Sequence, residues 1–202
     1  LGYKTRLNAF DANVALFRIE RPFAFTDSST LLNNLPVYRE AGKQRNRGFE
    51  GSISGNVTLD LSMTAMVSWL DPRMVASANA ASRDKKIVGL SSWTASLMGD
   101  MRIRAVPGLS VNANFITMNR RAANYANTDW IGGYGRLDVG ARWEQQLWGH
   151  DTTWRLTVYN VTNQRYWTNI VAGGLNGYSG NGNATADVGD PRSAMLTVQF
   201  AL

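Results

Sequence analysis

Histidine, cysteine and clustered carboxylates, which carry most metal binding and nucleophilic catalysis, are scarce in this sequence. Its 202 residues contain no cysteine and one histidine, His150. The absence of thiols excludes disulfide bonds, thiolate metal sites and a cysteine nucleophile. A zinc site would need mostly carboxylate ligands, and the sequence shows no such cluster. We interpret His150, in the turn-like segment LWGHD, as a solvated turn residue, and we expect neither enzyme activity nor a bound metal.

The segment from 163 to 191 carries two weaker signals. Its glycine-rich part, GGLNGYSGNGN (173–183), has no following Lys-Ser/Thr and therefore does not match a phosphate-binding loop. Asp187 and Asp190 are too few carboxylates to predict a calcium site. We interpret the segment as a flexible loop and expect no cofactor.

The chain is basic, with a net charge of +6 and a pI of about 9.9. Nucleic-acid binding is one explanation. However, Lys and Arg are scattered between the expected strands rather than aligned along a helix, so attraction to anionic ligands or lipid headgroups explains the charge at least as well. We therefore expect no nucleic-acid partner.

The elements that position these residues are indicated by a strict alternation in NVTLDLSMTAMVSWL, residues 56–70. Every odd position from Val57 to Trp69 is apolar, whereas the even positions are polar except for Met66. A period of two predicts a β-strand with one apolar and one polar face. No run of eighteen apolar residues is present, which excludes a transmembrane helix but not a membrane-spanning β-barrel.

The same alternation recurs along the chain and predicts an all-β antiparallel meander of about nine long strands. The predicted strands are 1–7, 12–24, 38–55, 57–70, 89–105, 109–121, 133–146, 152–162 and 192–202. Short turns alternate with longer loops at about 25–37, 71–88, 122–132 and 163–191. This arrangement is typical of a transmembrane barrel with short periplasmic turns and long extracellular loops.

Strand length distinguishes the barrel from a soluble β-sandwich, which also alternates but uses strands about half as long. Eleven residues at about 3.3 Å each, tilted by about 40°, cover roughly 28 Å of membrane. Trp69, Trp93, Trp143 and Trp154 fall near the ends of the apolar faces, as in an interfacial aromatic girdle. Nine strands are an odd number with two open edges, so we expect an incomplete arc of a larger barrel.

Several motifs resemble those of TonB-dependent outer-membrane receptors, especially the siderophore-receptor branch. VYNVTNQRYW (158–167) and GDPRSAMLTVQFAL (189–202) resemble the last two strands of that family. The segment 42–72, with Arg47, Gly48 and Glu50, resembles its Arg-Gly-x-Glu strand, and VPGLSV (106–111) resembles one of its periplasmic turns.

The resemblance implies a 22-stranded barrel around a plug domain in the bacterial outer membrane. It also implies import of ferric siderophores or similar scarce ligands with energy passed through TonB. Residues 1–202 would be the C-terminal portion of that barrel, without the plug domain and the earlier strands. The expected partners are a ferric siderophore or similar small ligand, TonB, the plug domain, and outer-membrane lipid and lipopolysaccharide.

Arginine and aromatic side chains in the expected extracellular loops suit an anionic siderophore that carries planar rings. The candidate ligand-binding residues are Arg120, Arg121, Tyr125, Trp130, Tyr166, Trp167 and Tyr178. An alternative is that these residues are rim aromatics that anchor the barrel in lipopolysaccharide. The alternative functions are a passive porin, an outer-membrane enzyme and a soluble carbohydrate-binding sandwich.

Overall fold

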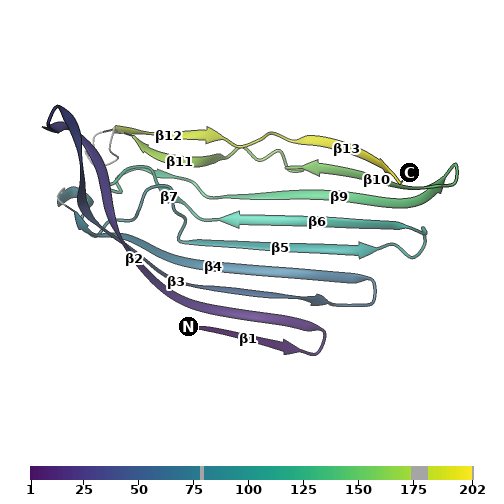
Figure 1. Ribbon diagram of the computed structural model, residues 1–202. Coiled ribbons are helices and arrows are strands. Elements are labelled where there is room, and N and C mark those ends of the chain that lie inside the picture. The colour runs from purple at the N-terminus through teal and green to yellow at the C-terminus, as the bar shows by residue number, and fades with distance from the viewer. Residues whose placement is uncertain (78–79, 174–181, 202) are drawn as a thin grey trace.

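The computed structural model describes residues 1–77, 80–173 and 182–201. Nine strands form one curved sheet in the order β1-β2-β3-β4-β5-β6-β9-β10-β13, with every neighbouring pair antiparallel (Figure 1). The strands are β1 (Gly2–Leu7), β2 (Phe10–Leu32), β3 (Leu35–Asn56), β4 (Leu61–Ser77), β5 (Trp93–Arg102), β6 (Leu109–Met118), β9 (Tyr134–Leu147), β10 (His150–Tyr159) and β13 (Ser193–Phe200).

The connections give the sheet two different ends. Short turns join β1 to β2, β3 to β4, β5 to β6 and β9 to β10, and we call their side the turn end. The opposite loop end holds two small sheets, β7 (Arg121–Ala122) with β8 (Trp130–Ile131), and β11 (Trp167–Gly173) with β12 (Gly182–Val188) (Figure 1). A single 3-10 turn, η1 (Ala80–Ser82), follows β4. No helix in the described part of the chain is long and apolar enough to cross a membrane.

The predicted nine-stranded meander is confirmed, but several predicted boundaries are wrong. The strand β4 continues to Ser77, into the expected loop at 71–88, and the expected loops at 122–132 and 163–191 contain the short strands of the two small sheets. The expected loop at 25–37 is instead the tip of a long hairpin, because β2 continues to Leu32 and β3 begins at Leu35. The predicted strand 57–70 begins only at Leu61. The Thr58 hydroxyl accepts hydrogen bonds from the amides of Asp60 and Leu61, at 3.2 and 3.0 Å, which closes residues 57–60 into a turn.

The strand register shows which side chains share a face. Ala65, Leu97, Phe115 and Leu137 lie opposite one another on β4, β5, β6 and β9 and belong to the apolar face of the sheet. Leu97 is 44% and Phe115 is 42% exposed, and no second sheet covers this face within the described residues. The arrangement agrees with the expected barrel wall and not with the alternative of a soluble sandwich, in which two apolar faces meet.

Tryptophans mark both margins of the apolar face. Trp69 lies opposite Trp93 toward the loop end and stacks on Phe49 at 6.3 Å, whereas Trp143 lies opposite Trp154 at the turn end. Measured along the direction of β5, the two tryptophan margins are ten residues apart. At about 3.3 Å per residue and a strand tilt near 40°, this spacing is roughly 25 Å along the membrane normal. This height matches the apolar band of an outer-membrane barrel. The predicted aromatic girdle is thus present at both interfaces.

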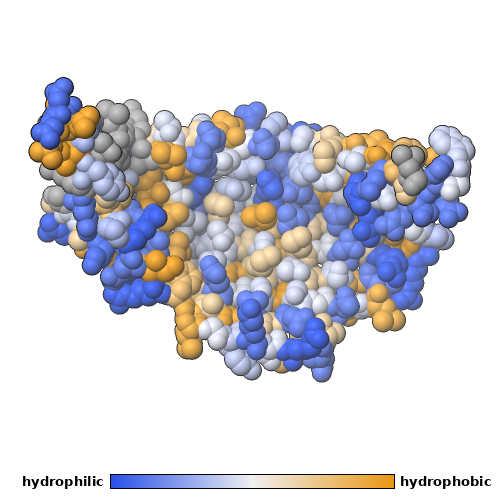
Figure 2. Space-filling model, in the orientation of Figure 1, coloured by the Kyte–Doolittle hydropathy of each residue, from blue (hydrophilic) through white to orange (hydrophobic). Residues whose placement is uncertain are grey.

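The opposite face of the sheet is polar and concave. Asn114 and Asp138 lie next to each other on β6 and β9 and alternate with the apolar row. In Figure 2 hydrophilic residues gather toward the two ends of the sheet, with a paler, mixed surface between them. The sheet is open, because β1 pairs only with β2 and β13 pairs only with β10 among the described residues. This agrees with the expected arc of a larger barrel.

Candidate functional site

Two arginines and two tyrosines form a compact cluster on the polar face at the loop end, which we call the Arg–Tyr cluster. Tyr134 opens β9 at a position whose alternation faces the polar side, and its ring stacks on Tyr166 with centroids 4.2 Å apart. The Arg121 guanidinium lies 5.9 Å from the centre of the Tyr134 ring. The Nη1 atom of Arg136 lies 3.4 Å from the Tyr166 hydroxyl, which accepts its hydrogen bond.

Arg121 is the least compensated charge of this cluster. The residue is 5% exposed, its Nη2 donates a hydrogen bond to the Trp167 carbonyl oxygen, and its Nε is buried without a partner. No carboxylate in the described part of the chain pairs with it. Burial lowers the pKa of the Arg121 guanidinium, yet an arginine remains protonated at neutral pH. The cluster therefore presents a positive charge, beside aromatic rings, that lacks an anion.

The positive charge of Arg136 is paired with a carboxylate, although its buried Nε has no hydrogen-bond partner. Its Nη2 donates to the Asp138 carboxylate at 2.9 Å, and the other Asp138 oxygen accepts the Asn160 amide at 2.8 Å. The Arg136–Asp138 pair lies on the polar face of the sheet, which faces the lumen of a barrel. A second lumen-facing pair, Arg142 with Glu144, lies toward the turn end at 3.4 Å. The charge of Arg136 is thus compensated, unlike that of Arg121.

The asparagines of the VYNVTNQRY segment shape the loop that carries Tyr166. Asn160 is buried and adopts a positive φ of 49°, and its side-chain amide donates to the carbonyl oxygens of Gln164 and Asp190. Its Oδ1 accepts the Gln164 amide at 2.9 Å. Asn163 accepts the Arg192 amide at 3.1 Å. These bonds tie the loop after β10 to the segment that leads into β13.

Gly189 leaves room for the Tyr166 ring. A Cβ atom at position 189 would lie 2.3 Å from two ring carbons of Tyr166, closer than any side chain tolerates. The Gly189 amide also donates to the Tyr166 carbonyl at 2.8 Å. The glycine of the GDPR motif is therefore needed for the position of Tyr166 in the Arg–Tyr cluster.

The structure brings only some of the predicted ligand-binding residues together. Arg121 and Tyr166 join the cluster, and Trp167 contributes its carbonyl oxygen while its side chain is 49% exposed. Arg120 instead stacks on Trp130, with 4.7 Å between the guanidinium carbon and the ring centre. Tyr125 packs against Phe23, with 6.5 Å between the ring centroids, and burial raises the pKa of its hydroxyl. The last predicted residue, Tyr178, lies outside the described residues.

Tyr134 and Arg136 are not among the ligand-binding residues predicted from the sequence. The alternation in the predicted strand 133–146 indicates the face of the sheet on which Tyr134 lies. Leu137 and Val139 define the apolar face, so Tyr134 and Arg136 occupy the opposite face at the end nearest the long loops. Their contact with Tyr166 depends on the loop after β10, whose path the alternation does not describe.

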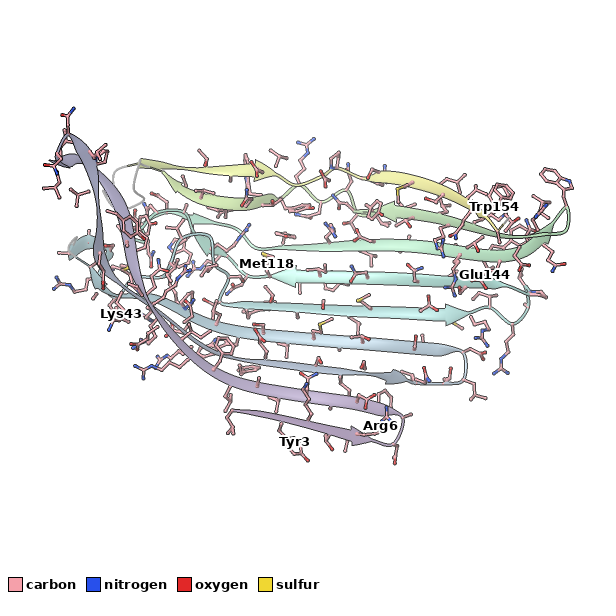
Figure 3. The ribbon with its side chains drawn as sticks, viewed as in Figure 1. Tyr3, Arg6, Lys43, Met118, Glu144 and Trp154 are labelled. Carbon is pink, nitrogen blue, oxygen red and sulfur yellow. The ribbon has the colours of Figure 1, made fainter. Side chains whose placement is uncertain are left out.

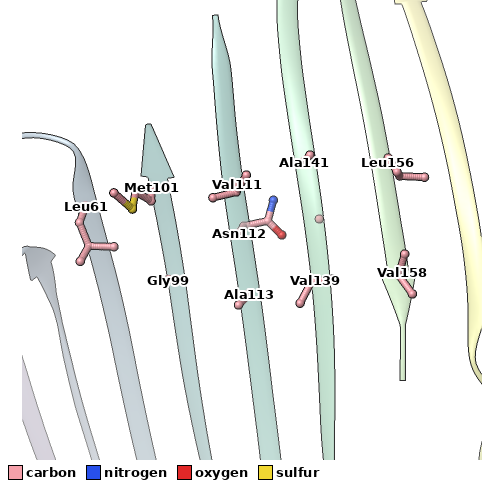
Figure 4. Close-up of a pocket in the computed structure, with 11 residues that line it drawn as sticks. Leu61, Gly99, Met101, Val111, Asn112, Ala113, Val139, Ala141, Leu156 and Val158 are labelled. Atoms are coloured by element: carbon pink, nitrogen blue, oxygen red, sulfur yellow. The ribbon is translucent and has the colours of Figure 1, made fainter. Parts of the chain in front are cut away.

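A shallow apolar depression of about 530 Å³ lies away from this cluster, on the apolar face (Figure 4). Its floor is formed by small residues such as Gly99, Ala113 and Ala141, and its sides by Leu61, Met101 and Leu156. Because the tryptophan margins place this surface within the lipid band, the depression suits a hydrocarbon chain rather than a polar ligand. Among the described residues no group of three potential metal ligands occurs.

Long antiparallel strands, an exposed apolar face bounded by tryptophans and a polar concave face define the wall of an outer-membrane β-barrel. The family model described as TonB dependent receptor-like, beta-barrel matches residues 1–163. The chain belongs to this family and forms part of its β-barrel. TonB-dependent receptors reside in the bacterial outer membrane and are transport receptors rather than enzymes.

Individual relatives are siderophore receptors. The ferrichrome receptor FcuA of Yersinia enterocolitica is 31% identical over 200 residues, which are 99% of this chain and 24% of the relative. The crystal structure of BauA, the ferric preacinetobactin receptor of Acinetobacter baumannii, aligns with a TM-score of 0.79 and 29% identity over 98% of this chain and 28% of BauA.

A more distant structure shows the same fold. The ferric yersiniabactin uptake receptor FyuA of Yersinia pestis aligns with a TM-score of 0.75 at 14% identity, covering 100% of this chain and 29% of FyuA. The chain spans about a quarter of the length of the curated relatives it matches.

Proposed function

We propose that the protein to which this chain belongs imports a ferric siderophore, or a similar scarce anionic ligand, with energy passed from TonB to a plug domain. Residues 1–202 form the C-terminal portion of its barrel, and the rest of the protein supplies the plug domain and the remaining strands. The similarity to the ferrichrome receptor FcuA and to the ferric preacinetobactin receptor BauA supports the proposed ligand class.

The observation that carries the proposal is the unpaired guanidinium of Arg121 beside the Tyr134–Tyr166 stack. A buried cation is costly unless an anion compensates it. A ligand with acidic groups would supply that anion, and planar rings would stack on the tyrosines. In a barrel with short periplasmic turns, the loop end lies on the extracellular side of the membrane. A ligand that arrives from outside the cell therefore meets the cluster before it enters the barrel.

The import step is tested with the full-length receptor in an iron-starved bacterium that lacks its own siderophore receptors. Growth on ferrichrome or ferric preacinetobactin is expected only when TonB is present. Equal uptake without TonB would instead identify a passive channel. Binding of each ferric ligand to the detergent-purified receptor measures recognition separately from transport.

The ligand-binding role of Arg121 is tested with Arg121→Met in the same receptor. Loss of the guanidinium is expected to weaken ligand affinity about five- to hundredfold, because a few anchoring side chains dominate a binding site. Arg165→Met, which removes an exposed arginine from the neighbouring loop, serves as the control and is expected to leave affinity unchanged. Equal affinity in both variants would show that Arg121 only supports the loop through Trp167.

A further inference from the structure

Three of the segments that connect the strands at the loop end share a small packed interior. We call them the outer loop body; they are residues 84–92, 119–131 and 166–170. Each segment contributes buried apolar side chains, whose exposed fractions lie between 0% and 9%: Ile87, Ala122, Ala123, Tyr166 and Ile170. Figure 3 labels Met118, the last residue of β6, after which the middle segment begins. These connections thus have a core of their own beyond the lipid band.

Backbone contacts join the first segment to its neighbours. The Ile87 amide donates to the Pro72 carbonyl of β4 at 3.1 Å, and the Gly89 amide donates to the Ala122 carbonyl of the middle segment at 3.0 Å. Gly89 adopts a φ of 79°, and a Cβ atom at this position would collide with the carbonyl oxygen of Ile170. The third segment therefore packs directly on the Gly89 backbone.

Asn127 joins the middle segment to the first one through its side chain. Its Oδ1 accepts the Lys86 amide at 2.6 Å, and its Nδ2 donates to the Lys86 carbonyl oxygen at 3.0 Å. The side-chain amide thus satisfies both backbone groups of one residue, as a neighbouring strand would. Asn127 has a positive φ of 60°, which asparagine adopts more readily than most residues. The Trp130 Nε1 donates to the Asn127 carbonyl oxygen at 2.9 Å and holds this turn in place.

Arg121 lies where the three segments meet. It forms a β-bridge with Ser91 of the first segment, and its Nη2 donates to the Trp167 carbonyl oxygen of the third. Ala122, the next residue along the chain, accepts the Gly89 amide. The guanidinium is therefore oriented by contacts that the protein itself supplies.

We infer that the outer loop body is assembled before the ligand binds, and that Asn127 and Gly89 are positioning residues that orient Arg121 within it. Segments that are already ordered lose little conformational entropy on binding, so a preassembled site binds more tightly than one that must first become ordered. The positioning role rests on the proposed ligand-binding role of Arg121. The assembly of the body, in contrast, is a property of the free receptor.

The first test measures amide hydrogen exchange in the detergent-purified full-length receptor without ligand. Peptides that cover residues 84–92 and 119–131 are expected to exchange at least about tenfold more slowly than the same peptides in the urea-unfolded receptor, because their amides are hydrogen-bonded within the body. Exchange as fast as in the unfolded chain, with protection only after a ferric ligand is added, would overturn the inference.

The variant Asn127→Gly removes the side-chain contacts with Lys86 and tolerates the positive φ. Two hydrogen bonds are lost, so exchange of both peptides is expected to become about tenfold to hundredfold faster. Association of ferrichrome or ferric preacinetobactin is expected to slow about two- to tenfold, because fewer receptors hold the binding-competent arrangement. The dissociation rate is expected to stay unchanged, whereas Arg121→Met, which removes a direct contact, is expected to raise it.

The matched control for this variant is Asn8→Gly. It makes the same change at a positive φ of 54° in the turn between β1 and β2, at the other end of the wall. This variant is expected to leave exchange in the outer loop body and both rate constants unchanged. Equal effects of the two variants would overturn the positioning role of Asn127.

The variant Gly89→Ala tests the contact with the third segment, and Gly149→Ala is its control. The two glycines have nearly the same φ, 79° and 80°, so an added methyl group strains both backbones alike. A Cβ atom at position 149, however, has no atom within 4 Å. Only Gly89→Ala is therefore expected to speed exchange and slow ligand association, as Asn127→Gly does.

Unchanged exchange in both Asn127→Gly and Gly89→Ala, or faster dissociation with unchanged association, would overturn the positioning role. Failure of the unaltered receptor to bind either ferric ligand would contradict the proposed function, and exchange in the free receptor would then still decide whether the body is preassembled. Native folding of the barrel in each variant is verified by its resistance to unfolding in SDS before heating.

Discussion

Tyr166 depends on a single glycine for its position. Gly189 allows the ring to approach the backbone, and the ring then stacks on Tyr134 and accepts the hydrogen bond of Arg136. At the scale of single residues, the structure thus explains why asparagines and a glycine occur in the segments 158–167 and 189–202. They shape the loop that carries the candidate ligand-binding residue, rather than contacting a ligand themselves.

The Gly189→Ala variant tests this dependence. Its added Cβ atom collides with the Tyr166 ring, so we expect a loss of about 1–3 kcal/mol in stability together with weakened ligand binding. Thermal unfolding of the detergent-purified receptor and ligand titration measure the two effects. Gly132→Ala is the matched control, because no atom lies within 4 Å of a Cβ at that position. Equal behaviour of the two variants would contradict the proposed role of the glycine.

At the scale of elements, the long β2–β3 hairpin differs most from the expectation. Residues 25–37 are rich in threonine, serine and asparagine, which favours a loop in a reading based on composition. Beyond the lipid, however, the backbone can continue the antiparallel ladder and satisfy its own hydrogen bonds, because the hairpin turn closes at residues 32–35. Pairing with a neighbouring strand therefore overrides the local composition.

The two faces of one strand are tested by neighbouring substitutions in β5. Leu97 on the apolar face and Met98 on the polar face have nearly the same exposure, 44% and 45%. Leu97→Lys places a charge near the middle of the lipid band and is expected to cost about 2–4 kcal/mol, whereas Met98→Lys faces the lumen and is expected to cost less than about 1 kcal/mol. Denaturant unfolding of the full receptor from lipid bilayers measures both. Similar costs would show that the faces are wrongly assigned.

At the scale of the whole molecule, the sheet ends in two open edges. The outer sides of β1 and β13 present backbone donors and acceptors that no described strand pairs. Within hydrocarbon each unsatisfied group costs several kcal/mol, and in water such an edge promotes aggregation. The wall therefore needs further strands to close it, in agreement with a chain that spans about a quarter of its relatives.

The 202-residue chain by itself is expected not to form a stable barrel. After refolding in detergent micelles, we expect no monomeric form that resists SDS and no core protected from protease, because both edges remain unpaired. The full-length receptor treated in the same way is the control and is expected to show both properties. A folded, protease-resistant monomer of the 202-residue chain would contradict this expectation.

The sequence by itself determined the architecture of the wall. Alternation is a local property, since neighbouring side chains of a strand point to opposite faces, so the apolar positions around Leu61 and Leu97 and the tryptophan margins were predictable. The number of strands followed from the alternation, and the two ends followed from the lengths of the loops. These features need no knowledge of which strands touch.

Only the tertiary structure decided which residues form sites. Tyr134 and Tyr166 are 32 positions apart and meet because the loop after β10 folds back over β9, held by Asn160. Cross-strand register likewise places Arg18, Arg47 and Asp71 in one row although they come from three strands. Contacts between distant segments depend on register and loop path, and the alternation of a single strand carries neither.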